Sequence, residues 1–156
     1  MSTSEDLANR IREAFLNGKW IANTNYKLLL AGINREQALR KFGALNSIAS
    51  LTYHINYYLD GLLVVFNGGD LTIKDKFSFA LPSLNSEEDW IDLKTVLLKN
   101  AESLAQKVSL MPEEKLDSPF VRPEYGTYRR NVEGVLEHSY YHLGQISLLI
   151  RLFSTS

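Results

Sequence analysis

The stretch TYRRNVEGVLEHSYYHLGQISLLIRLF, residues 127–153, decides the fold of this chain. Its apolar residues recur at spacings of three and four, which is the period of an amphipathic α-helix. The positions that carry this stripe are Val132, Val135, Leu136, Leu143, Ile146 and Ile150. The stretch therefore predicts one long helix with an apolar face that needs partners.

The same helical spacing extends outward from this stretch to the rest of the chain. It recurs in three further segments, residues 4–17, 46–67 and 86–110. Short helices are predicted between residues 19 and 46, and long loops, partly extended, over residues 69–85 and 112–126. The chain has no convincing series of strands. Four long amphipathic segments predict an all-α helix bundle in a single domain, residues 1–156.

Charge and composition exclude several classes of protein. The net charge is -1, so the chain lacks the basic surface that nucleic acid requires. Arg129 and Arg130 are predicted to lie on a solvated helix face. The apolar runs fall far below the ~20 residues of a membrane span and the polar N-terminus lacks the core of a signal peptide, which predicts a cytoplasmic protein. Cysteine is absent, which excludes disulfides, thiolate ligands and a cysteine nucleophile.

The chain contains three histidines, and their positions predict one metal site. His138 and His142 lie four residues apart on the last predicted helix, so both imidazoles face the same side. His54 lies on the apolar stripe of residues 46–67, from which it completes three nitrogen ligands if the two helices are neighbours. Structural zinc sites usually have four ligands and many cysteines, whereas catalytic sites keep a position open. The sequence therefore favours a working site over a structural one.

Two other interpretations of the histidines compete with this hypothesis. The metalloprotease motif His-Glu-x-x-His places its general base directly after the first histidine. That position is Ser139 here, so peptide hydrolysis is not expected. Alternatively, the histidines are satisfied core or surface residues, as lone helical histidines usually are.

Polar residues and glycines near the histidines are candidates for further contacts. Asn131, Gln145 and Tyr58 can orient the ligands or contact a substrate, or they can be polar and packing residues without such a role. Gly61 and Gly134 cost helix stability, so each is expected either to open room near the metal or to allow close packing. The sequence assigns no catalytic residue.

Four segments resemble the DinB/YfiT-like superfamily and together cover nearly the whole chain. The most specific is LEHSYYHLGQI, residues 136–146, which resembles the last-helix signature of that family. The others are NSIASLTYHINYYLDGLL, LTIKDKFSFALPSLNSEEDW and YGTYRRN. The resemblance implies a four-helix bundle with an up-down-down-up course, often as a homodimer. It also implies a divalent metal ion, most often zinc or nickel, held by His54, His138 and His142.

The resemblance and the open three-nitrogen site together predict a metal-dependent enzyme. The first hypothesis is an S-transferase that joins a low-molecular-weight thiol, such as bacillithiol, to a small electrophilic substrate. The second is a metal-dependent hydrolase of small amides or esters, although the sequence offers no obvious carboxylate base beside the histidines. The third is a non-catalytic protein that binds a metal ion or a small ligand.

Overall fold

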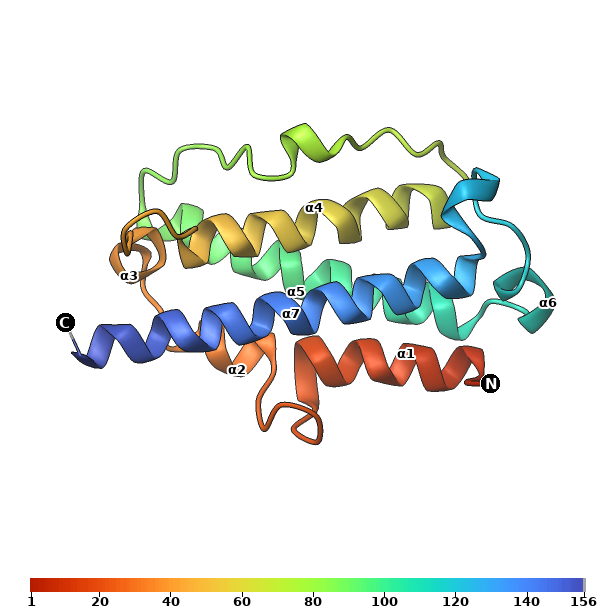
Figure 1. Cartoon of the computed structure of the whole chain (residues 1–156), viewed down its shortest axis with the longest axis horizontal. Helices are drawn as coiled ribbons and strands as arrows, with labels where there is room; N and C mark the ends of the chain where they lie inside the picture. Colours follow the sequence, from red (N-terminus) through yellow and green to blue (C-terminus); the bar gives the residue numbers. More distant parts are fainter. Residues whose placement is uncertain (156) are drawn as a thin grey trace.

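A computed structural model describes residues 1–155 as helices joined by loops (Figure 1). The long helices are α1 (Ser4–Arg12), which the π-helical turn η1 (Glu13–Asn17) continues, α4 (Ile48–Phe66), α5 (Glu87–Ser109) and α7 (Tyr128–Thr155). The short elements are α2 (Tyr26–Ala31), α3 (Arg35–Leu39), α6 (Glu113–Leu116) and the 3-10 turns η2 (Asp75–Phe77) and η3 (Pro123–Tyr125). No β-strand forms within residues 1–155, which confirms the all-α prediction.

The helices begin where the sequence supplies a capping side chain. Thr3, Ser47 and Ser86 each accept a hydrogen bond from the backbone N–H three residues further on. Asp6 and Asp89 bond back to the capping residue and so complete a capping box at α1 and α5. These caps fix where α1, α4 and α5 begin, and every long helix begins and ends within two residues of its predicted segment.

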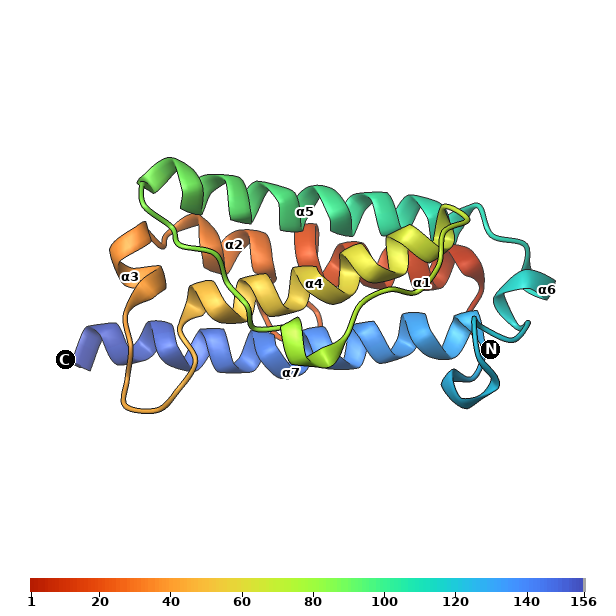
Figure 2. The same ribbon diagram turned by 90° about the horizontal axis from the view of Figure 1, so that it is seen from above.

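The four long helices lie side by side along the longest axis of the molecule (Figures 1 and 2). α4 and α5 run in one direction, whereas α1 and α7 run in the other. α5 packs against α1 and α4, and α4 packs against α7. The largest fully buried side chains of their shared core include Trp90, Tyr26, Phe15, Leu59 and Leu97. The two helices that carry the predicted metal ligands, α4 and α7, are therefore neighbours.

The chain between α4 and α5, residues 70–85, runs back along α4 and is called the crossing segment below (Figure 1). Tyr57 fastens it, because its hydroxyl donates to the Lys74 carbonyl at 2.9 Å and accepts from the Lys74 N–H at 2.8 Å. Gly61 allows Ile73 to approach, since a Cβ at Gly61 would lie 2.5 Å from Ile73 Cδ1. Of the two roles expected for Gly61, the structure therefore supports close packing.

Arg129 corrects one expectation, because this residue is only 6% exposed and not solvated. Its Nε donates to Asp117 Oδ1 at 2.6 Å, and its Nη2 donates to Asp117 Oδ2 and Glu113 Oε2 at 3.1 Å each. Its Nη1 donates to the Ser2 carbonyl. These four residues, called the Arg129 clamp below, join the N-terminus and the α6 region to α7. Arg130 lies on the exposed side of α7, as predicted.

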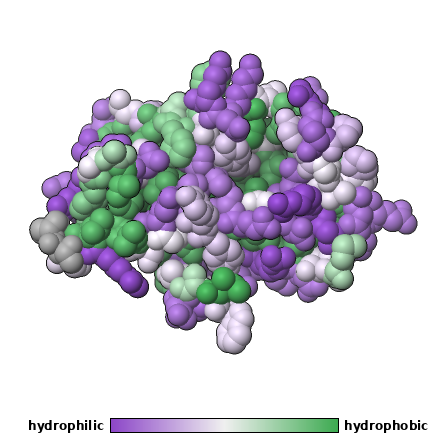
Figure 3. Space-filling model, in the orientation of Figure 1, coloured by the Kyte–Doolittle hydropathy of each residue, from purple (hydrophilic) through white to green (hydrophobic). Residues whose placement is uncertain are grey.

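The surface carries both hydrophilic and hydrophobic areas. Figure 3 shows a hydrophobic area at the end of the molecule where α3 and the C-terminal half of α7 lie. Leu45 and Leu148 are 51% and 58% exposed, and both line a hollow of about 280 Å³. Within residues 1–155, no helix combines the length and the apolar character that crossing a membrane requires.

Candidate metal centre

The imidazoles of His54 on α4 and of His138 and His142 on α7 meet between the two helices. His138 Nε2 lies 2.9 Å from His54 Nε2 and 3.0 Å from His142 Nε2. Ring nitrogens of all three residues lie within 4.8 Å of one another. Three nitrogens bound at about 2.0–2.1 Å to one tetrahedral zinc ion would lie roughly 3.3 Å apart. The three histidines can therefore hold a metal ion after small movements of their side chains.

The helical pattern explains why these side chains meet. His138 and His142 lie one turn apart on α7, and His54 lies on the face of α4 that packs against α7. His54 is 6% and His142 is 7% exposed, and His138 is half-buried. Burying three imidazoles against one another is costly unless something satisfies their polar nitrogens.

Gln145 fixes the orientation of His142. Its Oε1 lies 2.6 Å from His142 Nδ1, and because an amide oxygen only accepts, we assign the proton to Nδ1. His142 Nε2 then presents a lone pair to His138. Whichever way His138 Nε2 is protonated, one of its two nitrogen contacts lacks a hydrogen bond. A cation satisfies all three lone pairs at once, so the donor set fits a metal ion better than it fits a hydrogen-bonded cluster.

Phe79 of the crossing segment covers His54. The two rings are stacked with centroids 3.9 Å apart and an angle of 6° between their planes. His54 Nδ1 is the one buried side-chain nitrogen or oxygen within residues 1–155 that has no hydrogen-bond partner. The crossing segment therefore closes this side of the centre and shields it from water.

Burial disfavours the protonated form of two imidazoles of the centre, those of His138 and His54. It lowers the pKa of His138 to about 4, and the nearby His142 and His54 lower it further. Burial and then the proximity of His142 also lower the pKa of His54, while the Ser78 backbone and the charge of Asp75 oppose this shift. A neutral imidazole offers its lone pair without first losing a proton, so these ligands are ready to bind metal at neutral pH.

Tyr58 and Asp75 form a hydrogen-bonded pair beside the histidines. The Tyr58 ring meets both His54 and His138 edge-on, with centroids 5.2 Å apart in each case. Its hydroxyl donates to Asp75 Oδ1 at 2.8 Å. Burial and this bond raise the pKa of Tyr58, so the hydroxyl stays protonated and holds the carboxylate in place.

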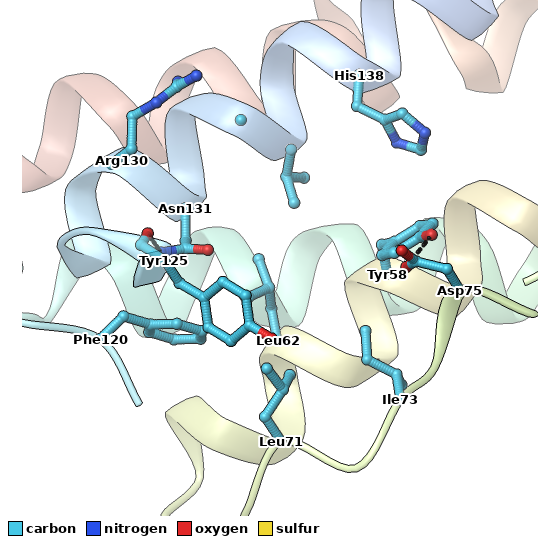
Figure 4. A pocket seen from close by; sticks show the side chains of 12 residues that line it. Tyr58, Leu62, Leu71, Ile73, Asp75, Phe120, Tyr125, Arg130, Asn131 and His138 are labelled. Carbon is cyan, nitrogen blue, oxygen red and sulfur yellow. Dashed lines mark hydrogen bonds between the residues drawn. The ribbon is translucent and has the colours of Figure 1, made fainter. Parts of the chain in front are cut away.

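A cavity of about 480 Å³ opens beside His138, between α7, α4 and the crossing segment (Figure 4). Most of its wall is apolar and comes from Leu62, Leu71, Ile73, Phe120 and Val135. Gly134 forms part of the α7 side, and a Cβ there would meet nothing within 4 Å. Of the two roles expected for Gly134, the structure therefore supports open room.

Asn131 lies in the wall of this cavity, two helical turns before His138 on α7. Its Nδ2 donates to the Tyr125 and Thr127 carbonyl oxygens, at 2.8 Å each. The structure thus brings Gln145 and Tyr58 against the histidines and places Asn131 at a distance from them, within the same cavity.

Two residues of the site, Asp75 and Phe79, were missed by reasoning from the sequence. The sequence offered no obvious carboxylate beside the histidines, and the structure supplies one, since Asp75 lines the cavity together with His138. Both residues belong to the crossing segment, which has no helical period to predict its path. The alternation of Phe77, Phe79 and Leu81 was the one signal that part of this segment faces the protein.

A scan against protein-family models found no match, and searches of curated proteins and of solved structures found none either. The resemblance to the DinB/YfiT-like superfamily therefore stays a prediction. The geometry of the three histidines and of the cavity beside them is what points to a function.

Proposed function

We propose that the protein is a metal-dependent enzyme of the DinB-like type, a four-helix bundle with an up-down-down-up course. Its activity would be the transfer of a low-molecular-weight thiol to a small electrophile. The observation that carries this proposal is the cluster of three imidazoles beside a cavity of about 480 Å³. A chain without cysteine must take its thiol from a second substrate.

The residues around the centre would divide the work of binding and positioning. His54, His138 and His142 would hold a divalent ion, and the family resemblance favours zinc or nickel among the metals that imidazole ligands suit. When bound, this ion would lower the pKa of a thiol or of water and so supply the nucleophile. Gln145 holds His142 in the tautomer that binds metal, and Phe79 keeps water from His54.

The cavity would receive the electrophile, and Asp75 would accept the proton that the thiol releases. In the transfer, the thiol S–H bond breaks, a carbon–sulfur bond forms, and the leaving group departs from the same carbon. Asp75 lines the cavity and is held by Tyr58, so it can accept the thiol proton and pass it to solvent.

The proposal is tested with protein loaded with zinc or nickel, a low-molecular-weight thiol such as bacillithiol, and a chromogenic electrophile. We expect a metal-dependent rate above the background of the free thiol, abolished in His142→Ala. Gly144→Ala on the same helix is the matched control and keeps the rate, since a Cβ there meets nothing within 4 Å. The proposal fails if the fully loaded protein shows no rate above the background.

Hydrolysis of small amides or esters is the second candidate, and Asp75 favours it. A carboxylate beside the centre is the general base that the sequence had not revealed. Simple aryl esters with the zinc-loaded protein test this alternative. Turnover without added thiol that falls at least tenfold in Asp75→Asn, with metal content unchanged, would establish hydrolysis in place of thiol transfer.

We also propose a homodimer, for which the hydrophobic area at the α3 end offers a surface. Leu45 and Leu148 line the hollow in this area, and each is more than half exposed. Tyr141, on α7, is also more than half exposed. Sedimentation of the wild type and of Leu148→Glu tests this assembly, since a charge in a dimer interface should shift the protein to the monomer.

A further inference from the structure

The cavity beside the metal centre differs in character along its length. At one end it reaches His138, with Tyr58 and Asp75 close by. At the other end it reaches Asn131, on the same face of α7 (Figure 4). Seven residues separate His138 from Asn131, which is about 10 Å along a helix axis. A ligand that uses both ends is therefore elongated.

The wall between the two ends is apolar and unobstructed. Leu62, Ile73 and Val135 line it, and Gly134 leaves its α7 side open. A glycine in the middle of a helix costs about 1 kcal/mol relative to alanine. No neighbouring atom requires a glycine at this position, so the open space itself is the evident gain. The middle of the ligand is therefore apolar.

The chemistry at the far end is that of a hydrogen-bond acceptor. Both protons of the Asn131 amide nitrogen are directed at carbonyl oxygens, those of Tyr125 and Thr127. The amide cannot turn over without losing both bonds, so Oδ1 is fixed as the atom presented to the cavity (Figure 4).

Arg130 does not supply a competing cationic end. Its guanidinium bonds Glu137 at 3.2 Å, and the two side chains are 58% and 64% exposed. Figure 4 shows the Arg130 side chain directed away from the Asn131 side chain. Arg130 is the one cationic residue that lines the cavity within the described chain, and its pairing with Glu137 offsets its charge, so an anionic group at this end would meet the Asn131 oxygen without an unpaired cation.

We propose that this cavity binds an elongated small molecule with a metal-binding group at one end, an apolar middle over Gly134 and a hydrogen-bond-donating group that Asn131 Oδ1 accepts. This specificity rests on the proposed metal centre and deepens the proposed function. It makes Asn131 a determinant of the substrate and Gly134 the residue that leaves space for it.

The test is a binding experiment on cobalt-loaded protein with thiols of the form HS–(CH₂)n–CONH₂ and with chains of the same length that end in a methyl ketone. Thiolate-to-cobalt absorption and calorimetry report binding without any turnover. We expect the tightest binding at the chain length that spans about 10 Å between the two ends. The carboxamide should bind three- to tenfold more tightly than the ketone, because the ketone has no proton to donate.

Two variants assign this preference to the proposed residues. In Asn131→Leu the carboxamide and the ketone should bind equally, and an unchanged metal content and circular dichroism spectrum show that the fold is intact. In Gly134→Leu the side chain should fill the cavity and weaken the long thiols at least a hundredfold, while metal affinity is kept. Gly144→Leu on the same helix, where a Cβ also meets nothing within 4 Å, should leave binding unchanged.

The inference is wrong if the wild type does not distinguish carboxamide from ketone, or if Gly134→Leu binds the long thiols as the wild type does. It is also wrong if a carboxylate-ended chain binds more tightly than the carboxamide. A parallel series with a hydroxamate in place of the thiol tests the cavity specificity independently of thiol transfer. Length and end-group preferences with hydroxamates, but no binding of thiols, would support the cavity specificity and overturn thiol transfer.

Discussion

Two polar clusters are built around buried side chains of α7, and they differ in how fully their members are satisfied. In the Arg129 clamp, the guanidinium meets two carboxylates and a carbonyl oxygen, so donors face acceptors throughout. In the histidine cluster, three like groups face one another, and His54 Nδ1 has no partner. A cluster of matched partners holds the fold together. A cluster of mismatched ones is incomplete until a ligand arrives, and this difference separates structure from function on a single helix.

The largest effect expected concerns the ion itself. Zinc or cobalt should bind with one equivalent per chain, and a free concentration of 100 times Kd should raise the free energy of unfolding by about 2.7 kcal/mol. Thermal unfolding with and without the metal measures this, and His138→Ala should remove the stabilisation. If no divalent ion changes the thermal unfolding of the wild type, the three histidines do not form a metal site.

Removing the support of one ligand should have the next largest effect. Gln145→Leu leaves His142 in place but removes the acceptor for its Nδ1 proton, at 2.6 Å in the wild type. Loss of such a partner typically weakens metal binding ten- to hundredfold. A competition titration with a metal chelator measures the change, and the unfolding of the metal-free protein serves as the control because it should be nearly unaltered.

Disrupting the clamp should change stability and leave metal binding alone. Arg129→Met keeps the apolar stem and removes the bonds to Asp117 and Glu113, for an expected loss of about 2 kcal/mol in the free energy of unfolding. Urea denaturation measures it, with the exposed Arg130→Met as the matched control, expected to change stability by less than about 0.5 kcal/mol. A loss of metal affinity in Arg129→Met would contradict the separation of the two clusters.

The smallest effect expected is the response of the clamp to acid. Hydrogen bonds from Ser4 and then from Arg129 lower the pKa of Glu113, and the bond from Arg129 lowers that of Asp117. Carboxyls with a lowered pKa in the folded state stabilise it above their ordinary pKa values of about 4, and this stabilisation is lost as the pH falls through the lowered values. Urea denaturation at pH 6 and at pH 3 should therefore show a smaller loss in Arg129→Met than in the wild type.

The sequence predicted the helices and the shared side of His138 and His142 well, because both depend on a short repeating pattern. Four apolar stripes set the helix boundaries, and the four-residue spacing of His138 and His142 placed two imidazoles on one side. Neither conclusion needed any long-range contact, and the capping side chains Thr3 and Ser86 reinforced it locally.

The parts that the sequence did not predict depend on partners far along the chain. Arg129 has the pattern of a surface residue, and only its meeting with Asp117 and Ser2 buries it. Asp75 and Phe79 reach the centre because the crossing segment folds back on α4. That path depends on the contact of Gly61 with Ile73 and on the hydrogen bond from Tyr57 to Lys74, and helical periodicity predicts neither.

The hydroxyl of Tyr57 has a consequence for how this protein can change over time. The Tyr57 side chain bonds both the N–H and the carbonyl of Lys74, the two backbone groups that a neighbouring β-strand would otherwise bond. The segment that shapes the cavity is thus anchored through backbone groups, whose chemistry is independent of the residue at position 74. Position 74 can therefore accept other side chains without loss of the two bonds that hold the crossing segment along α4.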